Sequence, residues 1–196
     1  MARPKKSNKE EMATVKIENA FWRLMETERY ADITVRRITQ ESGVNRNSFY
    51  YHYRDIDDLA YAAFRKNVEN ETSEKLIHAL LASFQDEGDA SIIALDPAIL
   101  LHSKRVMLCA ASDSTYLRRL VGNLLKEIWF NALSVKEELL STDEKLQVNF
   151  IFSGLVATLG SQEIRESPLS MSILSQTEIG KAVISAMKKI SSSQET

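Results

Sequence analysis

Seven residues between positions 45 and 52 have side chains whose types and spacing could do chemistry together: Asn45, Arg46, Asn47, Ser48, Tyr50, Tyr51 and His52. An arginine can donate two parallel hydrogen bonds to O6 and N7 of guanine, and an asparagine can pair with adenine in the same two-point way. Hydroxyl groups and a partly charged histidine suit phosphate oxygens, which fix register without reading sequence. The stretch therefore combines groups for reading bases with groups for holding a nucleic-acid backbone.

Two short helices are expected to position these side chains. Thr34 is a good N-cap for a helix over 35–41, and Ser42 and Gly43 break it, because glycine tolerates the left-handed conformation of a sharp turn. Asn45 then caps a third helix of about seven residues. This spacing predicts a helix-turn-helix, whose second helix is small enough to enter the major groove of DNA.

A small apolar core is expected to hold the second of these helices in place. A preceding helix is predicted from about Ser7 to Glu28, with Ile17, Phe21 and Leu24 on one face. The apolar positions that should close the core against it are Ile33, Val35, Ile38, Val44, Phe49 and Tyr53. They leave the polar side chains of 45–52 on the outer face.

Charge is divided unequally along the 196 residues. The whole chain has 25 Lys and Arg against 27 Asp and Glu, a net charge of −2. Residues 1–54 have 11 basic and 7 acidic residues, a net +4, whereas residues 55–196 have 14 and 20, a net −6. Arg36 and Arg37 add cations near the turn, Arg36 being the better candidate contact, and so does the tail with Arg3, Lys5, Lys6 and Lys9. The positive segment is the one that carries the helix-turn-helix.

The stretch TVRRITQESGVNRNSFYYHYRDIDDL resembles the DNA-binding signature of TetR-type transcriptional regulators, over about Ile17 to Phe64. The resemblance implies an N-terminal three-helix module that binds operator DNA and a larger helical domain that dimerises and binds a small effector. A fourth helix would connect the two. By position, it makes the candidate DNA contacts Thr34, Arg36, Asn45, Arg46, Asn47, Ser48, Tyr50, Tyr51 and His52. Ile56 stands where the family often has lysine, which leaves Arg54 as the nearest cation.

The rest of the chain is also expected to be helical, because glycine and proline are few and apolar residues recur every three to four positions. The predicted fold class is all-α, with a helix-turn-helix DNA-binding domain over 1–54 and a C-terminal ligand-binding and dimerisation domain over 55–196. Further helices are predicted over 55–83, 98–111, 115–140, 141–166 and 177–190, with a polar break over 85–89 that contains Gly88.

Two features of the C-terminal part have more than one interpretation. The small residues Gly154, Ala157, Thr158, Gly160 and Ser161 would allow a second subunit to approach closely, or they pack within one subunit. The candidate effector-binding residues are His102, Met107, Tyr116, Trp129, Phe130 and Phe152, with Cys109 and Phe150 as further apolar groups. Methionine and aromatic residues at helical spacing are more often plain core.

Several classes of function lack support in the sequence. Cys109 is the single cysteine, and His52, His78 and His102 fall in no nucleophile or metal signature. No apolar run approaches the roughly 20 residues of a membrane helix. We expect a cytoplasmic homodimer that is not an enzyme, has no cofactor and binds double-stranded operator DNA, most simply a repressor released by a small molecule. The alternative is a family member that has lost operator binding and acts through a protein partner.

Overall fold

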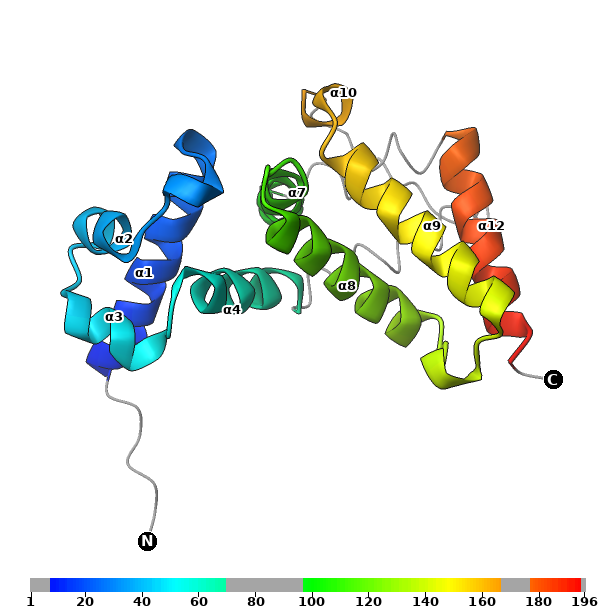
Figure 1. The fold of residues 1–196 in the computed structure, drawn as a ribbon, viewed down its shortest axis with the longest axis horizontal. Helices are drawn as coiled ribbons and strands as arrows, with labels where there is room; N and C mark the ends of the chain where they lie inside the picture. The colour runs from blue at the N-terminus through cyan, green and yellow to red at the C-terminus, as the bar shows by residue number, and fades with distance from the viewer. Residues whose placement is uncertain (1–7, 70–96, 167–176, 195–196) are drawn as a thin grey trace, which may run out of the picture.

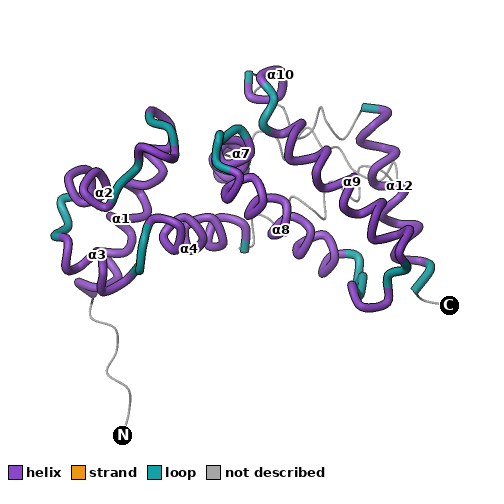
Figure 2. The backbone as a smooth tube through the Cα atoms, viewed as in Figure 1, coloured by secondary structure: helices purple, strands orange, loops and turns teal. Residues whose placement is uncertain are grey.

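The computed structural model describes residues 8–69, 97–166 and 177–194, and these residues form helices joined by short turns, with no strand among them (Figures 1 and 2). The predicted all-α fold is confirmed. The elements are α1 (Asn8–Thr27), η1 (Tyr30–Asp32), α2 (Val35–Ser42), α3 (Arg46–His52), α4 (Ile56–Val68), α7 (Pro97–Ala110), α8 (Thr115–Ala132), η2 (Glu137–Leu139), α9 (Thr142–Leu159), α10 (Gln162–Arg165) and α12 (Glu178–Ser192).

Side-chain caps set the start of the helices, as the sequence predicts. Thr34 Oγ1 accepts a hydrogen bond from Arg37 N at 3.2 Å, and the Asp55 carboxylate accepts one from Asp58 N at 2.8 Å. Ser141 and Glu144 form a reciprocal capping box at the start of α9. Gly43, with φ +67°, supplies the left-handed residue of the turn between α2 and α3.

Helix α4 is shorter than predicted. It ends at Val68, and Glu69 has φ −93° and ψ 71°, which is not helical. The prediction of one continuous helix to Ser83 is therefore wrong, because the helix is interrupted at Glu69. A helix end leaves its last carbonyl groups without helical partners. His102 Nδ1 of α7 lies 2.7 Å from Asn67 O and donates to it, which satisfies one of those carbonyls. The remainder of that predicted helix, the break over 85–89 and the residues Arg3, Lys5, Lys6, Ser7 and His78 lie outside the described residues.

Two C-terminal helices are also interrupted. The helix predicted to reach Leu140 ends at Ala132, where Ser134 has φ 54° and Val135 N donates to Phe130 O at 2.8 Å, the pattern of a Schellman motif. The helix predicted over 141–166 divides at Gly160, because Ser161 caps the separate turn α10 by accepting from Ile164 N.

The core is continuous from the N-terminal helices into the C-terminal ones. One apolar cluster includes Phe21 and Phe64 together with Leu117, Val121 and Leu159 of α8 and α9. A second cluster joins α8, α9 and α12 around Phe130, Phe152 and Met187. Helix α4 packs against both α7 and α8. The domain boundary after residue 54 stays a prediction, and the first cluster crosses it.

Candidate DNA-binding surface

Helix α3 divides cleanly into a buried and an exposed face. Phe49 is fully buried, and its ring packs against that of Tyr53 with centroids 5.7 Å apart. The exposed side chains are those of Asn45, Arg46, Asn47, Tyr50 and Tyr51, with Ser48 and His52 partly exposed. In Figure 1, α3 lies at the opposite end of the molecule from α9 and α12. Most of the side chains predicted to contact DNA therefore lie together on one accessible face.

Tyr53 fastens α3 to α1. Its hydroxyl donates to Glu18 Oε1 at 3.1 Å, and burial together with this carboxylate raises the pKa of Tyr53. Glu18 also pairs with Lys66 of α4 at 2.7 Å. One carboxylate on α1 thus connects to residues on both sides of the turn that follows α3. The sequence gives little sign of this link, since Glu18 and Tyr53 are 35 residues apart.

Arg46 is held along the helix by Tyr50. Its Nη2 lies 3.3 Å from the tyrosine hydroxyl, and its guanidinium carbon lies 5.5 Å from the ring centroid. Arginine has five N–H donors, so this contact leaves donors for a guanine edge. The arrangement reduces the rotamer freedom that Arg46 would lose on binding.

The two asparagines at the start of α3 have different geometry. Asn45 Oδ1 accepts from Ser48 N at 2.8 Å and so caps the helix. Two-point pairing with adenine needs the amide oxygen as well as the nitrogen, and capping occupies that oxygen. Asn47 is exposed, and its side chain makes no hydrogen bond to other residues within 8–69, 97–166 and 177–194. Asn47 is therefore the better placed of the two for base reading.

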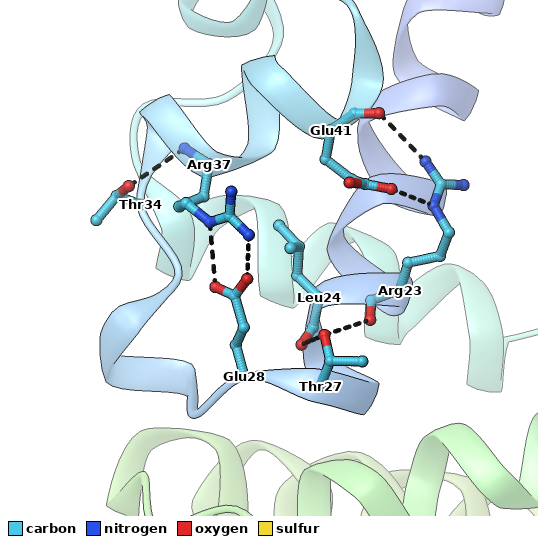
Figure 3. A network of polar contacts seen from close by, with 7 residues as sticks. All are labelled: Arg23, Leu24, Thr27, Glu28, Thr34, Arg37 and Glu41. Carbon is cyan, nitrogen blue, oxygen red and sulfur yellow. Dashed lines mark hydrogen bonds and ion pairs between the residues drawn. The ribbon is translucent and has the colours of Figure 1, made fainter.

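Ion pairs connect α2 to α1 and to the turn that follows α1 (Figure 3). Arg37 pairs with Glu28 through Nε and Nη2, and this hydrogen bonding lowers the pKa of Glu28 and raises that of Arg37. Arg23 Nε pairs with Glu41 at 2.7 Å. Arg36 is exposed and has no ion pair with any residue of the described ranges. Arg36 thus remains available to DNA, while Arg37 acts in positioning α2.

The structure also places the two residues at the α3–α4 junction. Arg54 is exposed, and it pairs with Asp58 through Nη2 at 3.3 Å while its backbone N donates to the same carboxylate at 2.9 Å. Ile56 is half-buried against the first core cluster. Position 56 therefore contributes packing, and the cation at this junction is Arg54.

In the part of the chain that the structure describes, the six candidate effector-binding residues lie in separate places. Two lie against α4: His102, buried at its end, and Tyr116, whose hydroxyl donates to Asp57 O at 3.0 Å. Trp129, Phe130 and Phe152 belong to the second core cluster. Met107 is half-buried on α7, and Cys109 is fully buried there, with burial raising the pKa of its thiol to about 12. Their contact with an effector stays a prediction.

Residues 19–63 match the family described as bacterial regulatory proteins, tetR family. The chain carries a TetR-family DNA-binding domain. The match begins within α1 and ends within α4, so it contains all nine candidate DNA contacts. The chain is thus a DNA-binding transcriptional regulator. No curated protein shows significant sequence similarity to it. Among the residues that the structure describes, no helix is long and apolar enough to cross a membrane.

Proposed function

We propose that this TetR-family regulator is a homodimeric repressor that binds a palindromic operator and is released by a small molecule. The observation that carries the proposal is the exposed face of α3, where Arg46, Asn47, Tyr50 and Tyr51 stand out from a fully buried Phe49. A helix of seven residues that is anchored on one side and offers amide and guanidinium groups on the other suits the major groove.

The dimer is supported by an exposed apolar stripe on α9 and an exposed isoleucine on α12. Leu146 and Phe150, one turn apart on α9, are 64% and 83% exposed, and Ile179 of α12 is 66% exposed. Exposed apolar patches of this kind mark contact surfaces, and a two-fold interface uses the same patch twice. Helices α9 and α12 pack on each other, so two copies would form a four-helix interface.

The small residues at the C-terminal end of α9 have two possible roles, which are close approach by a second subunit and packing within one subunit. A Cβ atom at Gly154 would meet no atom of another described helix within 4 Å, and Ala157 is exposed. A Cβ atom at Gly160 would lie 2.6 Å from Ala110 O of the same chain. Gly154 and Ala157 therefore support approach by a second subunit, whereas Gly160 serves packing within its own.

Release from DNA would act through α4, whose two ends are held by the C-terminal helices. Tyr116 of α8 contacts the start of α4 at Asp57 O, and His102 of α7 contacts its end at Asn67 O. A shift of α7 or α8 would therefore change the separation of two α3 helices that must sit about 34–36 Å apart on DNA. An effector that favours one of two states about 100-fold supplies about 2.7 kcal/mol of coupling.

A gel-shift series with DNA from upstream of the protein's own coding region, at several salt concentrations, tests the proposal. An affinity for one site far above the affinity for scrambled DNA supports the repressor, provided that the affinity falls steeply as the salt concentration rises. Weak binding that is indifferent to sequence contradicts it and favours a family member that acts through a protein partner. Sedimentation of the same preparation reports separately on the dimer.

A further inference from the structure

A hollow of about 420 Å³ lies between α8 and α9, apart from the DNA-binding surface. One wall is the face of α8 that carries Arg118, Arg119 and Lys126, and the other is the face of α9 that carries Phe152 and Val156. Its volume lies in the range of small-molecule sites, roughly 300–1,000 Å³. Helices α8 and α9 run side by side (Figure 1).

The charge of the hollow is opposite to that of the polypeptide around it. Among the described residues, three basic side chains and no acidic one line it, although residues 55–196 have 20 acidic against 14 basic residues. Lys126 Nζ forms an ion pair with Glu137 Oε1 at 2.7 Å. Arg118 donates one hydrogen bond to Ser112 O at 2.7 Å. Arg119 is exposed and has no ion pair within the described parts of the chain. The two arginines therefore leave donors free for an anion.

The floor of the hollow is apolar. Gly122 has no side chain to fill it, and a Cβ atom there would come within 3.4 Å of Val156 Cγ2. Phe152 and Val156 are both buried, while Asn123 and Asn149 add amide groups at the sides. Cations over an apolar floor fit a ligand that has an anionic group and a hydrocarbon or ring body.

We propose that the α8–α9 groove binds a small organic anion with an apolar body, its anionic group on Arg118 and Arg119 and its body over Phe152 and Val156. Thr115, which also lines the groove, directly precedes Tyr116, the residue that holds the start of α4. A ligand in the groove would thus change how Tyr116 holds α4, the helix that follows α3 and positions it. Only this regulatory consequence rests on the proposed function; the binding itself does not.

Calorimetric titration of the full chain with decanoate tests the site, with decan-1-ol as a neutral probe of equal length. Hydrogen bonds to a charged group contribute about 1.5–3 kcal/mol, so Arg119→Gln should weaken decanoate binding by about ten-fold or more. Asn123→Trp, which fills the groove from an exposed position, should weaken it as well. Lys189→Gln, which removes an exposed cation from α12, is the matched control and should bind like the wild type.

Three results would overturn the site: decanoate binding that is unchanged in both groove variants, equal binding of decan-1-ol, or an equal loss in Lys189→Gln. A gel shift with operator DNA and decanoate then examines regulation separately. Decanoate that binds the groove without changing operator affinity would support the site and overturn its effector role. Operator binding that fails without any probe present would instead contradict the proposed function and leave the calorimetric result intact.

Discussion

Replacing Gly160 by alanine gives a sharp test of how α9 ends. Gly160 has φ −82° and ψ −8°, a conformation that alanine adopts freely, so the backbone itself does not oppose the change. The new Cβ atom would lie 2.6 Å from Ala110 O, 2.8 Å from Ala110 C and 3.0 Å from Ala111 N. All three are backbone atoms at the end of α7 and cannot rotate away.

The expected effect follows from two opposing terms. Overpacking of this kind costs about 1–3 kcal/mol. Alanine in place of glycine stabilises the folded state by about 0.4–1 kcal/mol, because it reduces the conformational freedom of the unfolded chain. A contact of 2.6 Å with backbone that cannot move belongs to the upper half of the overpacking range, about 2–3 kcal/mol. The free energy of unfolding should therefore fall by about 1–2.6 kcal/mol in Gly160→Ala. For a chain of this length each kcal/mol corresponds to about 2–4 °C in melting temperature.

Gly154→Ala is the matched control, because it makes the same chemical change six residues earlier, where no atom of another described helix lies within 4 Å of the new Cβ atom. Gly154 lies on the face proposed for a second subunit, so the comparison is made where sedimentation shows unchanged association. The unfolding free energy of this variant should then stay level or rise by up to about 1 kcal/mol. Urea denaturation at one fixed protein concentration measures both variants against the wild type, and sedimentation shows whether association changes. A Gly160→Ala protein as stable as the wild type would refute the reasoning.

Three further predictions concern DNA, the dimer and pH. Arg46→Ala should lower discrimination between operator and scrambled DNA by about 1–3 kcal/mol, whereas His52→Ala should weaken all sites alike; equal losses in gel shifts would argue against these roles. Phe150→Glu should convert the dimer into monomer in sedimentation, because the two-fold axis would bring two carboxylates into one apolar face, and a persistent dimer would exclude this stripe as the interface. Burial lowers the pKa of His102, so the unfolded chain binds a proton that the folded chain does not. Stability should thus decline as pH falls through about 6.5, and the decline should be shallower in His102→Gln; identical pH profiles in urea denaturation would contradict it.

The starts of the helices were predictable from sequence because each cap acts within its own turn. Thr34, Asn45, Asp55 and Ser141 each accept a hydrogen bond from a backbone N–H three residues further on, so no distant residue takes part. The division of α3 into a buried Phe49 and an exposed polar face follows from helical periodicity in the same local way.

Helix ends and ion pairs were less predictable, since their partners are distant in the chain. The end of α4 is accompanied by a hydrogen bond from His102, 35 residues after Asn67. Glu28, directly after α1, engages Arg37, which leaves Arg36 as the available cation of the pair. The groove between α8 and α9 escaped prediction because its cations look like an ordinary solvated helix face until α9 lies beside them.

The sequence by itself determined that the described part of the chain is helical, that residues 34–53 form a helix-turn-helix and which side chains of α3 are exposed, because caps, a turn glycine and a period of 3.6 residues are local properties. Only the tertiary structure decided which of those side chains are already engaged, where α4 ends and which small residues of α9 face their own subunit. Each of these depends on atoms that packing brings together from separate helices.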